Sequence, residues 1–279
     1  MSGLNTLTNL PRAIARKAKN VFRFVTSEEY RDKREWERHR RNGEIVFART
    51  NGVVVAGPFK GLQYVESGRG SSLGPKLLGT YELELRETIE SIIQRGYKTV
   101  INIGAGEGYY GVGLAKRMPN SRLICFDAEP INREQITMLA RRNGVEAQID
   151  VRGLCDDMSL AQAIGDSNDV LVICDIEGAE VEVLRPDAVP SLKRADLLVE
   201  MHDIVRKGCS DAIRQRFAAT HDIEVIPTRK RGAGDFPAGV DLDPKQRQTC
   251  MDEGRGPIPM TFFWMRAKSP VPPTEGNHP

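Results

Sequence analysis

The sequence lacks any apolar run long enough to cross a bilayer, so we expect no membrane-spanning helix. Its 5 cysteines are an odd number without a CxxC pair, and they look like reduced cytosolic thiols. A strong excess of one charge is missing as well, because 40 Lys and Arg face 38 Asp and Glu. A net charge of +2 gives little attraction to nucleic acid. We therefore expect a cytoplasmic protein without a nucleic-acid partner.

What the chain does contain is enough for one sizeable α/β domain with additions. It has 279 residues, 40% of them hydrophobic and 28% charged, which is ordinary for a globular protein. We place an N-terminal extension of helices, hairpin and loop over residues 1–80 and the main domain over residues 81–268. The segment at about 228–260, rich in Gly, Pro and charge, is an expected irregular insertion, and residues 269–279 form an expected flexible tail.

The stretch KTVINIGAGEGYY, residues 98–110, is the most informative part of the chain. A β-branched apolar run ends in alternating glycines at Gly104, Gly106 and Gly108, and a helical pattern follows. Glycine permits positive φ and a close approach of ligand to backbone, and a helix N-terminus offers free N–H groups. The pattern predicts a strand, a loop and a helix that together bind a nucleotide-type cofactor.

From residue 98 onward, short apolar runs alternate with helical patterns. The strands that we predict are Thr99–Ile103, Arg122–Phe126, Ala147–Val151, Asp169–Cys174, Asp196–Met201, Asp222–Pro227 and Thr261–Ala267. The helices that we predict between them are Tyr110–Arg117, Asn132–Asn143, Met158–Ile164, Ala179–Leu184 and Ile204–Thr220. Such alternation predicts a mostly parallel sheet with helices on both faces and with ligands at the carboxyl ends of the strands.

The residues before this core show three further patterns. Residues 11–41 predict basic helices that either lie on an anionic membrane or partner, or pack on their own domain. We favour packing because the apolar face is narrow. Residues 44–56, with Asn51-Gly52 at the centre, predict a β-hairpin. Tyr81–Arg95 predicts a helix that Gly96 closes.

The glycine loop fits two kinds of cofactor. A dinucleotide fold wants G-x-G-x-x-G at a strand end, and the series Gly106, Gly108, Gly111 fits only if the first strand runs two residues further. Asp127 follows the second strand, where a carboxylate can accept both ribose hydroxyls of either nucleoside. Capping of the next helix is the other reading of Asp127, and we favour ribose contact because the spacing matches.

Acidic side chains and a histidine follow two later strands. Asp175 and Glu177 come after the fourth strand, and Glu200 and His202 end the fifth. A hydroxyl acceptor needs a base, and His202 is the natural candidate at neutral pH. Asp175, Glu177 and Glu200 would orient it or bind the acceptor. The alternative for Glu200 and His202 is a purely structural role at the strand end.

Five segments carry a resemblance to a known family: GAGEGYY, FDAEP, GLCD, DIEGAE and VEMHD, in this order over about residues 98–203. Together they resemble the FkbM-type class I S-adenosylmethionine-dependent methyltransferases. The resemblance implies a Rossmann-like, seven-stranded sheet in the order 3-2-1-4-5-7-6, mostly parallel with the last strand antiparallel. It also implies S-adenosylmethionine as cofactor and a methyl transfer, which we expect to reach an oxygen of a small molecule or sugar.

The resemblance also implies a set of site residues. The Gly104–Gly108 loop would hold the methionine end of the cofactor, Asp127 the ribose, and Asp156 the adenine amino group. The cofactor residues are Asn102, Gly104, Ala105, Gly106, Glu107, Gly108, Tyr109, Tyr110, Asp127, Ala128, Glu129, Leu154, Cys155, Asp156 and Asp175, and the catalytic candidates are His202, Glu177 and Glu200. The chain departs from the family at Asn102, where an acid is usual. An amide oxygen accepts from the cofactor's ammonium without a charge, and Glu107 would partly compensate.

Three alternatives stay open. The Gly106–Gly111 series is compatible with an NAD(P)-dependent oxidoreductase. Asn102 is compatible with a module that binds S-adenosylmethionine without catalysis. A divalent cation is the third alternative, although we expect no metal because the family is not known for one; its oxygen ligands would be Asp175, Glu177, Glu200 and Asp203.

Overall fold

The computed structural model describes residues 33–64, 73–255 and 260–268. The first 32 residues lie outside this range, and with them most of the predicted basic helices over 11–41 and their membrane or partner contact. Within the described ranges, none of the helices combines the length and the apolarity that crossing a membrane requires.

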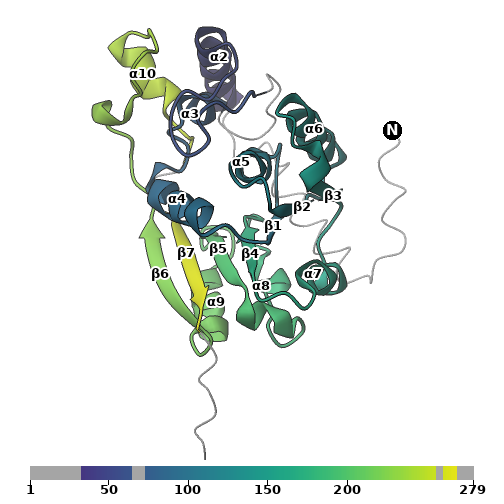
Figure 1. Cartoon of the computed structure of the whole chain (residues 1–279). Coiled ribbons are helices and arrows are strands. Elements are labelled where there is room, and N and C mark those ends of the chain that lie inside the picture. The colour runs from purple at the N-terminus through teal and green to yellow at the C-terminus, as the bar shows by residue number, and fades with distance from the viewer. Residues whose placement is uncertain (1–32, 65–72, 256–259, 269–279) are drawn as a thin grey trace, which may run out of the picture.

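A seven-stranded sheet in the order β3-β2-β1-β4-β5-β7-β6 forms the centre of the molecule (Figure 1). Its strands are β1 (Thr99–Ile103), β2 (Arg122–Phe126), β3 (Ile149–Arg152), β4 (Val170–Cys174), β5 (Asp196–Met201), β6 (His221–Pro227) and β7 (Thr261–Ala267). Strands β1 to β5 pair in parallel, whereas β7 runs antiparallel to β5 and to β6. The strand order and the reversed last strand implied by the resemblance are confirmed, and every predicted strand lies within two residues of its observed bounds.

The register of the parallel strands brings four strand ends to one edge. Ile103 at the end of β1 pairs with Phe126 of β2 and with Cys174 of β4, and Cys174 pairs with Val199 of β5. The loops that follow β1, β2, β4 and β5 therefore leave the sheet side by side. This edge is where ligands bind on open α/β sheets.

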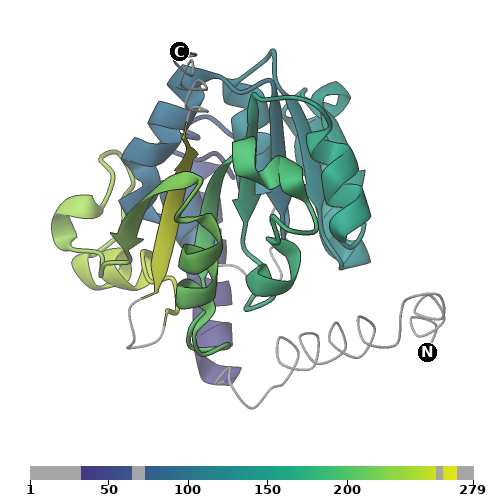
Figure 2. The same ribbon diagram turned by 90° about the horizontal axis from the view of Figure 1, so that it is seen from below.

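Helices cover both faces of the sheet, as predicted (Figures 1 and 2). On one side lie α4 (Arg86–Arg95), α5 (Tyr109–Arg117) and α6 (Pro130–Arg142), and on the other lie α7 (Asp157–Ile164), α8 (Glu180–Val183) and α9 (Cys209–Phe217). Short 3₁₀ turns are η1 (Leu83–Leu85), η2 (Glu146–Gln148), η3 (Pro190–Arg194) and η4 (Ala233–Asp235). Successive side chains of a buried strand point to opposite faces of the sheet and so pack in two apolar clusters. Val100 packs with the first group of helices and Ile101 with the second. Asn102 shares the face of Val100.

The hairpin predicted over residues 44–56 is wrong. Helix α2 (Lys33–Thr50) continues through this run, and Val46 is fully buried on it. Asn51 and Gly52 both have positive φ, but they end the helix, with the Gly52 N–H donating to the Phe47 carbonyl at 3.0 Å. An Asn-Gly pair satisfies a helix C-terminus as well as a hairpin turn, and packing of the apolar face overrides β propensity. A single antiparallel bridge, Val53 to Gln63, follows instead.

The helix predicted over Tyr81–Arg95 appears as η1 and α4, and Gly96 closes it at φ 66° as expected. The predicted irregular insertion also contains regular structure, since α10 (Pro244–Cys250) begins at the capping residue Asp243. This helix lies beside α2 and α3 (Leu73–Leu78) in Figure 1. The Asn42 amide donates to the Thr249 carbonyl at 2.9 Å, so the insertion is tied to the N-terminal part of the chain.

Candidate active site

The glycine loop leaves β1 as the sequence predicts and reaches the N-terminus of α5 at Gly108. Gly104 is required for packing, because a Cβ there would lie 1.8 Å from the Asp175 carbonyl oxygen of the neighbouring loop. Gly106 has φ +54°, and the space around its Cβ position is open to 4 Å. Backbone at Gly106 is thus exposed to a ligand in a place where a side chain would stand in the way.

Asp127, after β2, holds this loop in place. Its Oδ2 accepts from the Gly106 N–H at 2.8 Å, and its Oδ1 accepts from the Glu129 N–H at 2.9 Å and from Asn132 at 3.1 Å. Burial raises the pKa of Asp127, although these hydrogen bonds oppose the rise. The carboxylate is therefore largely occupied by protein donors, which is closer to the capping alternative than to a free ribose acceptor.

Glu129 lies two residues further along the same edge, and its carboxylate is free to accept hydrogen bonds from a ligand. It is half-buried at the start of α6, and its side chain forms no cap hydrogen bond. Ala128 beside it is exposed. Of the two carboxylates in FDAEP, Glu129 has the larger number of unoccupied lone pairs for a ligand.

The residues expected around the adenine follow β3 at the same edge. Leu154 is 45% exposed, an apolar surface that a flat ring could cover, while Cys155 is buried. Asp156 caps α7, where its Oδ1 accepts from the Ser159 N–H at 2.8 Å. These hydrogen bonds, led by that of the Ser159 hydroxyl, keep the pKa of Asp156 low. The observed role of Asp156 is thus to cap α7.

Asn102 is buried in β1, and its Oδ1 has no hydrogen-bond partner in the described part of the chain. Orphaned buried acceptors are rare and call for an explanation, of which a ligand donor is one. Glu107 does not supply the missing charge there. Its carboxylate is buried against Lys76, at 2.5 Å, and the Tyr64 hydroxyl, at 2.6 Å, both from the segment before the main domain.

Tyr109 and Tyr110 open α5 and contact Phe59 of that segment as well as the first residues of the main domain. The Tyr109 ring is 5% exposed and lies edge-on to Phe59, at 5.0 Å between centroids, and to Tyr81, at 5.4 Å. The Tyr110 hydroxyl donates to Glu82. The rings form a packed aromatic cluster behind the loop.

His202 follows β5 and is the best-positioned polar side chain of the site. Its Nδ1 lies 2.8 Å from Oε1 of Glu180, which is completely buried. Glu180 also accepts from the backbone N–H groups of Ile176 and Gly178, at 3.1 and 3.2 Å. The carboxylate thus ties the loop after β4 to the imidazole after β5. Sequence reasoning missed this role of Glu180, although it is the last residue of DIEGAE.

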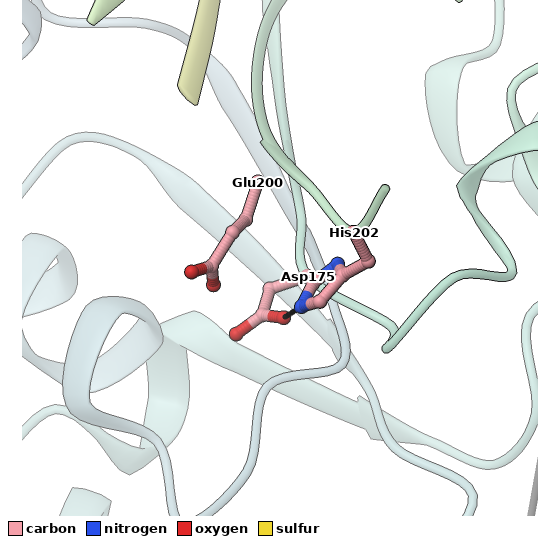
Figure 3. A group of neighbouring side chains, drawn as sticks. All are labelled: Asp175, Glu200 and His202. Carbon is pink, nitrogen blue, oxygen red and sulfur yellow. Dashed lines mark ion pairs between the residues drawn. The ribbon is translucent and has the colours of Figure 1, made fainter. Parts of the chain in front are cut away.

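The other nitrogen of His202 faces the predicted carboxylates. Nε2 lies 3.5 Å from Oδ1 of Asp175 and 3.6 Å from Oε2 of Glu177. Glu200 approaches from β5, and one ligand atom each of Asp175, Glu200 and His202 lie within 4.8 Å of one another (Figure 3). Glu177 has φ 54° and a side chain that is 46% exposed, an unusual backbone of the kind found at functional sites. Asp203 lies apart from this group and bonds to Ser210.

Electrostatics set the charge of His202. Burial alone would lower the pKa of His202, but the hydrogen bond to Glu180 and the charge of Asp175 outweigh it and raise the pKa to about 10. Partial burial and the charge of Glu200 raise the pKa of Asp175. In the metal-free protein His202 is therefore an imidazolium at neutral pH, which donates protons and does not accept them.

We expect nitrogen-15 NMR of the metal-free protein to show His202 protonated on both ring nitrogens at about pH 8. The pKa of His202 in the folded protein lies above the unfolded value of about 6.5. Protonated His202 therefore stabilises the fold fully below about pH 6.5, and this contribution to the free energy of unfolding is lost as the pH rises toward about 10. His221 is the internal control, since burial lowers the pKa of its imidazole. Titration of His202 at or below the pH of an ordinary histidine would contradict the assignment.

Arg255 completes the site and was not foreseen. It comes from the insertion, and its guanidinium donates to Glu200, to Glu82 at 2.9 Å and to Glu253 at 2.8 Å. Glu82 is 3% exposed with φ 46°. The start of the main domain, at Glu82, and the insertion therefore meet at the end of β5.

No protein-family profile matches this chain, and no curated protein matches it either. Among solved structures, it is similar to the O-methyltransferase TomG from Streptomyces achromogenes in complex with SAM, at 13% identity over 85% of this chain and 91% of that one, with a TM-score of 0.43. It is also similar to an O-methyltransferase from Bacillus cereus in complex with SAH, at 12% identity over 88% and 97% of the two chains, with a TM-score of 0.42. Similarity at this level leaves the chemistry to be derived from the chain's own residues.

Proposed function

We propose that this chain is an FkbM-type S-adenosylmethionine-dependent methyltransferase that methylates a hydroxyl oxygen of a small molecule or sugar. The observation that supports it most is the glycine loop at the carboxyl edge of a sheet ordered 3-2-1-4-5-7-6, with Asp175, Glu177 and His202 at the adjoining strand ends. The five segments that resemble the FkbM type support the narrower assignment.

The oxidoreductase alternative is less well supported. A dinucleotide fold has the order 3-2-1-4-5-6, whereas here β7 lies reversed between β5 and β6. β1 ends at Ile103, so Gly106 is not the glycine at the strand end. Gly111 lies within α5, where its Cβ position is 2.5 Å from the Cys125 sulfur, so packing explains it.

The residues present fit S-adenosylmethionine. The open space over Gly106 and the unpartnered oxygen of Asn102 would receive the methionine end, and Glu129 with Leu154 would receive the adenosine. When bound, the cofactor supplies a methyl group on a positively charged sulfonium. The carboxylates at the ends of β4 and β5 would then lie near that charge and stabilise it.

A residue of the chain would remove the proton of the acceptor hydroxyl. A hydroxyl oxygen loses its proton as it gains the methyl group, and the proton must go to a base. His202 is unsuited because it is already protonated, whereas Glu177 is partly exposed and faces the same space. We assign the base to Glu177, and in the metal-free protein His202, held by Glu180, supplies the charge that orients it.

Replacing Glu129 with Gln should weaken S-adenosylmethionine binding about ten- to hundredfold, because charge-assisted hydrogen bonds to a diol are lost. The melting temperature should stay near that of the wild type, since the side chain makes no cap contact. Asp127→Asn is the matched variant, and it should lower the melting temperature because Asp127 holds Gly106. Titration calorimetry and thermal melts measure both; an unchanged affinity in Glu129→Gln would refute the ribose assignment.

Glu177→Gln should lower kcat about a hundredfold, near the lower end for a general base because neighbouring carboxylates can take part. The affinity for S-adenosylmethionine should change little. Glu182→Gln, in α8 and paired with Arg206, is the control that should keep activity. The assay is formation of S-adenosylhomocysteine with a panel of hydroxylated acceptors, and full activity in Glu177→Gln would remove it as the base.

Titration calorimetry tests the proposal as a whole. We expect one S-adenosylmethionine per chain and no binding of NADH; the reverse would support the oxidoreductase. Turnover to S-adenosylhomocysteine would exclude the non-catalytic module. The buried, free thiols of all five cysteines fit the reducing cytoplasm, which we propose as the compartment.

A further inference from the structure

We propose that Asp175, Glu200 and His202 bind a divalent cation at the ends of β4 and β5. The inference rests on the proposed function only for what the cation does, and not for whether it binds. The three residues offer two carboxylate oxygens and one imidazole nitrogen within 4.8 Å of one another, from two neighbouring strands (Figure 3).

The imidazole is presented as a metal ligand. His202 is 2% exposed, so its orientation is fixed by the protein. Its Nε2 faces Asp175 and Glu177 at 3.5 and 3.6 Å, longer than a normal hydrogen bond, and no shorter contact of this atom occurs in the described residues. A buried nitrogen aimed at carboxylates across such gaps leaves room for an ion to replace the proton between them.

Outer partners hold two of the three ligands. Glu180 accepts from Nδ1 of His202 at 2.8 Å, the carboxylate–histidine arrangement that fixes the ring nitrogen turned to a metal. Arg255 donates to Oε1 of Glu200, which leaves the second oxygen of that carboxylate for a cation. Both partners come from outside the ligand set, and Arg255 comes from the insertion.

The ligand set suits a first-row cation such as Mn²⁺ better than Ca²⁺, because imidazole is included. A cation here would bind the acceptor hydroxyl and lower its pKa, so that Glu177 could remove the proton more readily. Asp175, Glu200 and His202 would then coordinate the ion, and Glu177 would act as the base.

The test is paramagnetic NMR of the wild-type chain with MnCl₂ as the probe. We expect the ring signals of His202 to broaden at about one Mn²⁺ per chain. The ring signals of His221 should broaden far less, because it bonds to Ala195, at the start of β5 and about 20 Å from its far end. Equal broadening of both histidines, or none, would overturn the proposal.

Variants extend the test by electron paramagnetic resonance, in which bound Mn²⁺ loses the free-ion signal. Asp175→Asn should weaken Mn²⁺ binding more than tenfold, and Glu180→Gln about ten- to hundredfold through His202. Glu134→Gln, an exposed acid on α6, should bind as the wild type does. Retained binding in Asp175→Asn would place the ion elsewhere. Calorimetry with S-adenosylmethionine in metal-free buffer tests the proposed function separately, so that the two can fail independently.

Discussion

Gly106→Leu should abolish S-adenosylmethionine binding, with an affinity loss of at least about a hundredfold. The new side chain would enter the open space above the loop, where the Cβ position meets nothing within 4 Å. The variant should still fold, since a non-glycine residue at φ +54° costs only about 1–2 kcal/mol. Titration calorimetry and a thermal melt measure the two effects.

Gly96→Leu is the matched control for backbone strain. Gly96 has φ +66° and an equally open Cβ position, but it precedes β1 and lies at the opposite edge of the sheet. It should show a similar loss of stability and an unchanged affinity. If both variants bound the cofactor as the wild type does, the glycine loop would not be the cofactor site.

Arg255→Met should destabilise the fold by about 3–5 kcal/mol, the cost of leaving the buried carboxylates of Glu82 and Glu200 without their cation, whereas Glu253 keeps Arg231. Glu82, Glu200 and Glu253 all contact this guanidinium and are 2–5% exposed in their side chains. Urea unfolding at neutral pH measures the loss. The deficit should shrink at about pH 5, because burial already raises the pKa of Glu82 and removal of Arg255 would raise it further.

Arg229→Met is the control from the same insertion. Arg229 pairs with Asp235 at 2.7 Å but is 49% exposed, so its removal should cost less than about 1 kcal/mol. Equal and small losses in the two variants would show that Arg255 does not hold the insertion to the end of β5.

The sheet could be predicted because its information is local. The central strands β1, β2 and β4 are short apolar runs, and they are followed directly by Gly104, Asp127 and Asp175. The structure of the N-terminal segment could not be predicted in the same way, because Asn51-Gly52 permits either a hairpin turn or a helix end. Burial of Val46 against distant residues decides between them, and the sequence alone does not show that packing.

Some residues of the site could likewise be predicted from the sequence, and others could not. Asp175 and His202 could be brought together from the sequence, because parallel strands end at one edge. Arg255 and Lys76 could not, since they reach the site from the insertion and the N-terminal segment. The proposal that Glu129, and not Asp127, binds the ribose also needed the structure, because it depends on which carboxylate already accepts from the Gly106 N–H.

A crystal structure with S-adenosylhomocysteine bound is the most direct measurement of the central claim. It should show the homocysteine over Gly106, the ribose at Glu129, and the sulfur facing Asp175, Glu177 and His202. A ligand bound away from the β1 loop, or with its sulfur turned from these strand ends, would contradict the account.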